Sequence, residues 1–194
     1  MNKTNIVLSD FFLNQQTVWL SEEADGGGPT YVPYEGGAEI RVLESMTSSN
    51  PSQVRTAAHE IGHFLTAPEY RLHLLDYGYA NTTESWSVKM WNLEFDVLAI
   101  QARILRGVQR HKQVDNLIND MPMFLRRSGQ SWLEATGIKQ KISESYSTWE
   151  NRIIADRVKE EIERRQDALP SYARLVGEFH RRCGLIKHQD VKAA

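Results

Sequence analysis

The chain has 194 residues, of which 41% are hydrophobic and 25% are charged. This is ordinary globular composition, and it excludes disordered, collagenous and low-complexity proteins. The net charge of −2 combines −8 over residues 1–100 with +6 over residues 101–194. Because opposite charges attract, we expect both halves to lie in a single domain, residues 1–194. The pI near 6.3 argues against a nucleic-acid binder.

The cysteine content and the hydropathy pattern bear on the compartment. Cys183 is the one cysteine, so no internal disulfide can form and a reducing environment is expected. The sequence has no apolar run of about 18 residues and no cleavable-signal pattern at its start. We therefore expect a cytoplasmic protein without a membrane-spanning segment.

Residues 1–48 are predicted to be rich in strands. Thr17–Leu20 and Thr30–Tyr34 consist largely of β-branched and aromatic residues. The turn signal Gly36-Gly37 precedes Ala38–Leu43, which alternates like a strand with one solvent-exposed face. These segments predict a small antiparallel sheet.

Residues 50–108 change to helical patterns. The first predicted helix begins near Pro51, which suits a first helical position, and ends at Pro68. A short helix is expected over Glu69–Leu75, and a long one over Glu84–Val108. The long helix is apolar on nearly all sides, which is typical of a central helix.

Residues 110–194 are predicted to be a helical remainder. Met121-Pro122 and Gly129 are expected to break it. Further helices are predicted over Ser147–Ala168 and from Pro170 to about Arg182, the last one closed by Gly184. Strands followed by helices indicate an α+β fold, with a small N-terminal antiparallel sheet packed on a helical bundle.

One motif carries chemistry: His59-Glu60-Ile61-Gly62-His63, an H-E-x-x-H within the first predicted helix. Residues four apart lie on one helix face, so both imidazoles can reach one metal ion at about 2.0–2.2 Å. Glu60 lies beside them and can hold or deprotonate a water on that ion. The alternative is a pair of histidines that only pack or form hydrogen bonds beside a glutamate.

Two histidines need a third protein ligand, and Glu94 is the preferred residue. Its neighbours on the predicted helix are mostly apolar, and a carboxylate there is costly unless it is paired or metal-bound. The alternative is an ion pair with an arginine such as Arg71. Asp76 is the next choice; it could instead accept an N–H from a ligating histidine, or be an ordinary turn aspartate.

The other reactive side chains give weak signals. Cys183 has no histidine or aspartate motif around it that would activate a thiol. The remaining histidines have no ligand spacing and are predicted to be surface residues: His73, His111, His180 and His188.

The residues around the motif resemble the bacterial elongation factor P hydroxylase family. That family reads H-E-I-x-H-W, then an arginine, then D-F-G-Y. The corresponding residues here, without a gap, are His59–Phe64, Arg71, Asp76, Gly78 and Tyr79. The family also has a glutamate that is followed, seven residues later, by Gln-Ala. When one deletion is allowed in the alignment, these residues match Glu94 and Gln101-Ala102.

The resemblance implies a compact α+β metalloprotein with a 2-His-1-carboxylate site, which suits Fe(II) and dioxygen. It implies that His59, His63 and Glu94 are ligands and that Glu60 handles protons. Arg71, Asp76, Tyr79 and Gln101 would shape the surrounding pocket. The implied reaction is hydroxylation of a modified lysine on a protein such as elongation factor P, and the acidic N-terminal half is consistent with a basic substrate.

This sequence departs from the family where substrate would be contacted. Ala80–Ser85 replaces W-Y and a P-D-G-R stretch, Val97 replaces an acidic residue, and the segment between Arg41 and His59 is about five residues longer. The substrate is therefore left open. The same residues also fit a small gluzincin-like zinc metallopeptidase with Glu60 as general base. A non-catalytic structural or interaction protein that kept the scaffold is a third interpretation.

Overall fold

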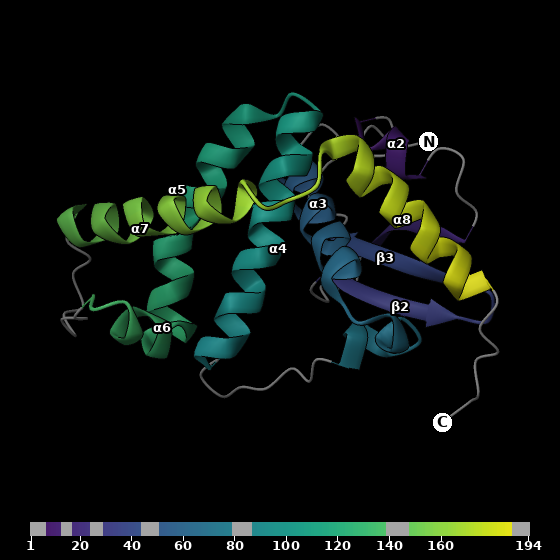
Figure 1. Cartoon of the computed structure of the whole chain (residues 1–194), viewed down its shortest axis with the longest axis horizontal. Coiled ribbons are helices and arrows are strands. Elements are labelled where there is room, and N and C mark those ends of the chain that lie inside the picture. The colour runs from purple at the N-terminus through teal and green to yellow at the C-terminus, as the bar shows by residue number, and fades with distance from the viewer. Residues whose placement is uncertain are drawn as a thin grey trace.

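The computed structural model describes residues 7–12, 17–23, 29–43, 51–78, 87–138 and 148–187. It shows a small sheet packed on a bundle of helices, as an α+β fold requires (Figure 1). The three strands are β1 (Val18–Glu23), β2 (Thr30–Tyr34) and β3 (Gly37–Leu43). The short helix α2 (Ser9–Phe12) precedes them.

The sheet is mixed, and the prediction of a purely antiparallel sheet is wrong. Its strand order is β1-β3-β2, with β3 antiparallel to β2 and parallel to β1. The tight turn after Tyr34, with Gly36 at φ +70°, folds β3 back along β2. Because β3 lies in the middle, β1 and β2 are adjacent in the chain but occupy opposite edges.

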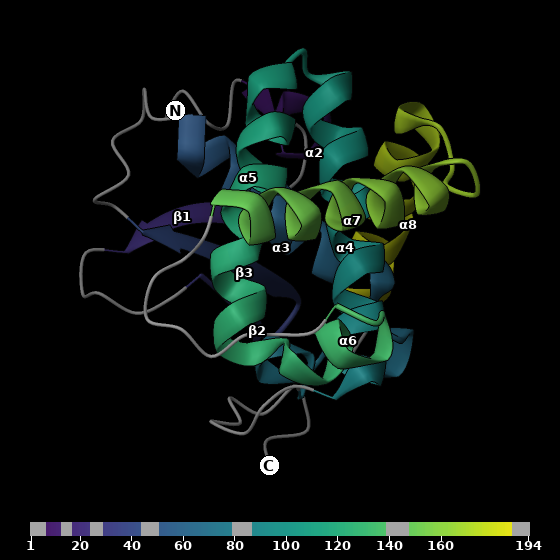
Figure 2. The same cartoon turned by 90° about the vertical axis from the view of Figure 1, so that its left-hand side faces the viewer.

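The main helices follow the sheet in the chain. Their bounds are α3 (Pro51–Thr66), α4 (Val88–Gly107), α5 (His111–Ser128), α6 (Gln130–Ala135), α7 (Thr148–Gln166) and α8 (Tyr172–Lys187). Helix α3 packs on β3 on one side and on α4 on the other. Helix α7 crosses α4 and α5, whereas α8 covers α3 and the sheet (Figures 1 and 2). Among the described residues, no helix has both the length and the apolar character needed to cross a membrane.

Three predicted helix boundaries are wrong. Residues 69–78 contain two short 3-10 turns, η1 (Glu69–Arg71) and η2 (Leu75–Gly78), rather than the single helix predicted over Glu69–Leu75. Helix α5 continues through Pro122, because the burial of its neighbours Met121 and Leu125 outweighs the cost of a proline. Helix α8 likewise continues past Gly184 to Lys187, since Cys183 and Ile186 are buried on either side of that glycine.

Gly62 lets α3 and α4 approach closely at the H-E-x-x-H motif. A Cβ atom added to Gly62 would lie 2.9 Å from Val97 Cγ1 and 3.0 Å from the Val97 carbonyl oxygen. Val97 is fully buried, so it cannot move aside into solvent. The glycine within the motif therefore fixes how near α4 comes to the two histidines.

Candidate metal centre

The two motif histidines converge as their spacing predicts. His59 and His63 lie one turn apart on α3, and their Nε2 atoms are 3.1 Å apart. Their rings are nearly perpendicular, with centroids 4.7 Å apart. Both lone pairs can therefore be directed at one point between the rings.

Glu94 of α4 completes the cluster. Its Oε1 lies 3.2 Å from His59 Nε2, and its Oε2 lies 3.5 Å from His63 Nε2. Glu94 contacts these two histidines rather than Arg71. Burial raises the pKa of Glu94, while the nearby His59 opposes the shift. A cation placed between the three side chains would stabilise the buried carboxylate.

The three side chains fit a single divalent ion. Ligand bonds of about 2.0–2.2 Å place neighbouring ligand atoms about 3.0 Å apart in octahedral and about 3.4 Å apart in tetrahedral geometry. The contacts among His59, His63 and Glu94 run from 3.1 to 3.5 Å. Within the described residues, these three form the His/Cys/Asp/Glu group whose ligand atoms all lie within 4.8 Å of one another. Two imidazoles and one carboxylate suit Zn(II) and Fe(II) equally.

Gln101 orients His59. The Gln101 side-chain Nε2 donates to the Arg55 carbonyl at 2.7 Å, which directs its Oε1 toward His59 Nδ1 at 3.3 Å. An acceptor at Nδ1 favours the tautomer that keeps the proton there and leaves the Nε2 lone pair for a metal. Gln101, one of the residues expected around the ligands, thus contacts His59 directly.

His63 lies deeper than His59 and is held by aromatic packing. Its ring lies nearly parallel to that of Tyr77, with centroids 6.4 Å apart, and Tyr77 stacks on Tyr31 at 4.3 Å. Burial, together with the nearby His59, lowers the pKa of His63 to about 3. The imidazole is therefore neutral near pH 7, the state that binds metal.

The turn that carries Tyr77 has an unusual backbone. Asp76, Tyr77 and Gly78 have φ values of 46°, 57° and 68°, in the left-handed region that side chains other than glycine rarely adopt. The Asp76 carboxylate accepts the Tyr31 backbone N–H at 2.8 Å. Of the three alternatives left open for Asp76, the described contacts agree with a turn aspartate, whose carboxylate ties η2 to β2.

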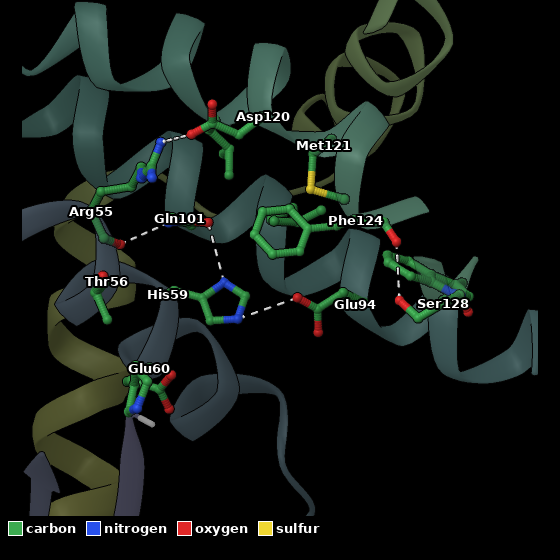
Figure 3. Close-up of a pocket in the computed structure, with 14 residues that line it drawn as sticks. Arg55, Thr56, His59, Glu60, Glu94, Gln101, Asp120, Met121, Phe124 and Ser128 are labelled. Atoms are coloured by element: carbon green, nitrogen blue, oxygen red, sulfur yellow. Dashed lines mark hydrogen bonds and ion pairs between the residues drawn. The ribbon is translucent and has the colours of Figure 1, made fainter. Parts of the chain in front are cut away.

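Glu60 is buried beside the cluster and carries no hydrogen bond from any described residue. Burial raises its pKa to about 7, the nearby His59 lowers it, and the carboxylates of Glu94 and Asp76 raise it. Its carboxylate lines the same pocket as His59 and Glu94 (Figure 3). It is therefore available to a water or a substrate.

The pocket in front of the centre has a volume of about 440 Å³. Helices α3, α4 and α5 supply most of its walls, and Pro29, just before β2, lies at its edge. Sequence reasoning missed the contribution of α5, because it expected a break at Met121-Pro122. The pocket residues that α5 provides are Leu117, Asp120, Met121, Phe124 and Ser128.

Arg71 and the remaining histidines that the structure describes do not line this pocket. Arg71 is half-buried in η1, and Tyr79 falls outside the described residues. His73, His111 and His180 are exposed, as predicted, whereas His188 is not among the described residues. Cys183 is buried, and burial raises the pKa of its thiol to about 12, as expected for an unreactive cysteine.

Comparisons with known proteins give no relative: no protein-family model, no curated protein and no solved structure matches the chain.

Proposed function

We propose that this protein is a metal-dependent hydrolase that cleaves an amide-type bond, with His59, His63 and Glu94 as metal ligands and Glu60 as general base. The observation that carries the proposal is the position of Glu60. Its carboxylate is buried, lines the pocket beside His59 and Glu94, and has no hydrogen bond from any described residue. A general base must lie within reach of the proton that it accepts, directly or through one water, and Glu60 is placed for this role.

The residues then have separate roles. A divalent ion at the cluster would supply a Lewis acid and lower the pKa of a bound water. Glu60 would accept the proton of the attacking water and deliver it to the leaving nitrogen. Gln101 keeps His59 in the tautomer that leaves Nε2 free, and the packing of Tyr77 against His63 holds the second ligand in place.

The test is Glu60→Gln in protein loaded with zinc. Hydrolysis of N-acyl amino-acid 4-nitroanilides should fall by at least about 100-fold while bound zinc, measured by elemental analysis, is unchanged. Glu134→Gln is the matched control, because Glu134 lies on the surface and bonds Gln130. Loss of zinc in Glu60→Gln, or unchanged hydrolysis, would contradict the proposed role.

A second candidate is an iron-dependent hydroxylase like the family that the sequence resembles, acting on elongation factor P or another protein. The observation that favours it is the position of Gln101. This residue is part of the resemblance, and its Oε1 lies 3.3 Å from Nδ1 of the proposed ligand His59. Three protein ligands with open positions also suit Fe(II).

Metal content and oxygen use separate these candidates. Protein purified without oxygen or added metal should contain one iron if it is a hydroxylase, and His59→Ala should remove it. It should then consume oxygen with elongation factor P present. Zinc with oxygen-independent hydrolysis supports the hydrolase. If neither the unchanged protein nor His59→Ala contained iron or zinc, this result would favour the non-catalytic interpretation.

A further inference from the structure

We propose that the pocket beside the metal centre binds an apolar, preferably aromatic, group of a small substrate, and not a lysine-like cation or an extended peptide. This inference rests on the proposed function, because it assigns the substrate class of the same site. Four features support it: the pocket walls, the partners of its polar side chains, the charge of the pocket, and the edge of strand β2.

The pocket walls away from the metal ligands are apolar. They are formed by the side chains of Trp91, Leu98, Leu117, Met121 and Phe124. A cavity of about 150 Å³ lined in this way binds benzene, and this pocket measures about 440 Å³. It therefore has room for a phenyl group together with the bond to be cleaved.

Apart from Glu60 and the proposed metal ligands, the pocket's polar side chains Arg55, Asp120, Gln101 and Ser128 already have partners in the protein. Arg55 forms an ion pair with Asp120 between α3 and α5 (Figure 3). Gln101 bonds the Arg55 carbonyl and His59, and Ser128 donates to the Phe124 carbonyl at 3.1 Å. A polar substrate group would compete with these contacts, whereas an apolar group would not.

The charge of the pocket also disfavours a cation. Its carboxylates are Glu60, Glu94 and Asp120. Arg55 neutralises Asp120, and a divalent ion would neutralise the remaining two. A substrate ammonium group would therefore meet a cluster without net negative charge and would lose its hydration.

The free edge of β2 is poorly suited to pairing with a substrate strand. On the central strand β3, Ala38 lies opposite Pro33 of β2. Its N–H points away from β2 and donates to the Thr17 carbonyl beside β1. This makes Tyr31 and Pro33 the β2 residues whose backbone groups face the free edge. The Tyr31 N–H is bonded to Asp76, and proline has no N–H. Strand addition needs both donors and acceptors, so an extended peptide is disfavoured there.

Hydroxamates test the inference, because they chelate the metal through one end and place a chosen group in the pocket. Zinc-loaded protein is titrated with acetohydroxamate, 3-phenylpropanohydroxamate and 6-aminohexanohydroxamate, and Kd is measured by calorimetry. The phenyl compound should bind at least about tenfold more tightly than acetohydroxamate, because it buries apolar area. The amino compound should bind no more tightly than acetohydroxamate.

Two variants locate the phenyl group. Met121→Trp fills the pocket and should remove the tenfold preference for the phenyl compound over acetohydroxamate, both measured on the same variant. Met123→Trp is the matched control, since Met123 is an exposed residue of the same helix that does not line the pocket. Phe124→Ala is a second test. Because Phe124 is a half-exposed wall residue, its removal should leave the protein folded, and it should reduce the preference for the phenyl compound at least about threefold.

The outcomes separate the two proposals. Equal affinity for all three compounds, or tightest binding of the amino compound, would overturn the substrate assignment and leave the metal centre intact. A preference for the phenyl compound that survives both pocket variants would also overturn it. Failure of all three compounds to bind zinc-loaded protein would overturn the proposed function itself.

Discussion

The α3–α4 layer and helix α7 both bury glutamate side chains, but they stabilise them in different ways. Glu60 on α3, Glu94 on α4 and Glu161 on α7 are each 8% exposed. Although burial also acts on Glu161, hydrogen bonds from Arg164 and Arg165 hold its pKa below the usual value. The pKa values of Glu60 and Glu94 are instead raised.

The difference is whether the protein supplies a cation. Glu161 has three arginines around it, including Arg157 at 3.3 Å. Glu94 has two histidines, and burial keeps one of them, His63, neutral. The described partners of Glu94 are thus two imidazoles and no arginine or lysine, so an external cation could stabilise this buried carboxylate, whereas Glu161 is explained by the fold alone.

The largest effect that this comparison predicts is for Glu94→Gln. The amide is nearly the same size but is a far weaker metal ligand. Zinc or iron affinity should therefore fall by more than the 10–100-fold that loss of an outer hydrogen-bond partner costs. Competition with a chelator measures it, and circular dichroism checks that the variant is folded. Unchanged affinity would remove Glu94 from the site.

Glu161→Gln is the matched change in the other region. It should leave metal affinity unchanged and lower the free energy of unfolding by about 1.5–3 kcal/mol, because the variant loses charged hydrogen bonds. Urea denaturation of the metal-free protein measures this change. The contrast between the two glutamates would be wrong if Glu161→Gln lowered the metal affinity. It would also be wrong if Glu94→Gln lowered the free energy of unfolding as much as Glu161→Gln does but left the metal affinity unchanged.

The next prediction concerns the distance between α3 and α4. Gly62→Ala places a methyl group against the Val97 carbonyl, and it should cost about 1–3 kcal/mol and weaken metal binding by moving Glu94 away. Thermal unfolding and metal titration measure both effects.

The control for Gly62→Ala is Gly177→Ala on the exposed side of α8, where a methyl group meets nothing within 4 Å. It should stabilise the protein by about 0.5–1 kcal/mol, because alanine favours helices more than glycine does. A stabilising Gly62→Ala would show that the helices are not held together as closely as described.

The sequence was sufficient to predict the His-His-Glu group that could hold a metal ion, because each signal was local to one helix. The i, i+4 histidines fix their own geometry, and the apolar neighbours of Glu94 indicate burial whatever packs against them. The helix bounds over 51–66 and 148–166 likewise follow from periodicity and agree within a few residues with those predicted.

Features that depend on contacts between distant segments were missed. The parallel pairing of β1 with β3 arises because β3 enters between β1 and β2, which no local pattern encodes. The left-handed turn at Asp76 and Tyr77 is held by contacts to β2 and α3. Its only local signal is Gly78, which alone does not reveal that the two residues before it share its backbone conformation.

A smaller effect is expected for Gln101→Ala. The variant removes the acceptor from His59 Nδ1, so the ring can rotate and change tautomer, and metal affinity should fall about 10–100-fold. Chelator competition measures this loss. Gln130→Ala is the control, because Gln130 bonds only a surface partner, Glu134. Equal affinities for the two variants would mean that Gln101 does not orient the ligand.

The smallest predicted effect lies in the acidic pH range and in helix α8. Hydrogen bonds from Arg181 and Arg182 lower the pKa of Glu178 to about 2, although partial burial opposes this. Arg182 in turn donates to the carbonyls of Phe64 and Ala67 at the C-terminal end of α3. Glu178 therefore supports the arginine that caps the metal-site helix.

A carboxylate whose pKa is lower in the folded state stabilises the protein above its unfolded pKa. The stabilisation is lost as the pH falls toward the folded pKa, here from about 4.5 to about 2. Glu178→Gln should reduce this loss, but by less than about 1 kcal/mol, because the pair is partly exposed. Urea denaturation of metal-free protein between pH 7 and pH 3 measures it. Glu163→Gln removes the same charge from an exposed position 4.0 Å from Lys159. An equal response of the two variants would show that Glu178 contributes only its charge, and not its contacts with α3 through Arg182.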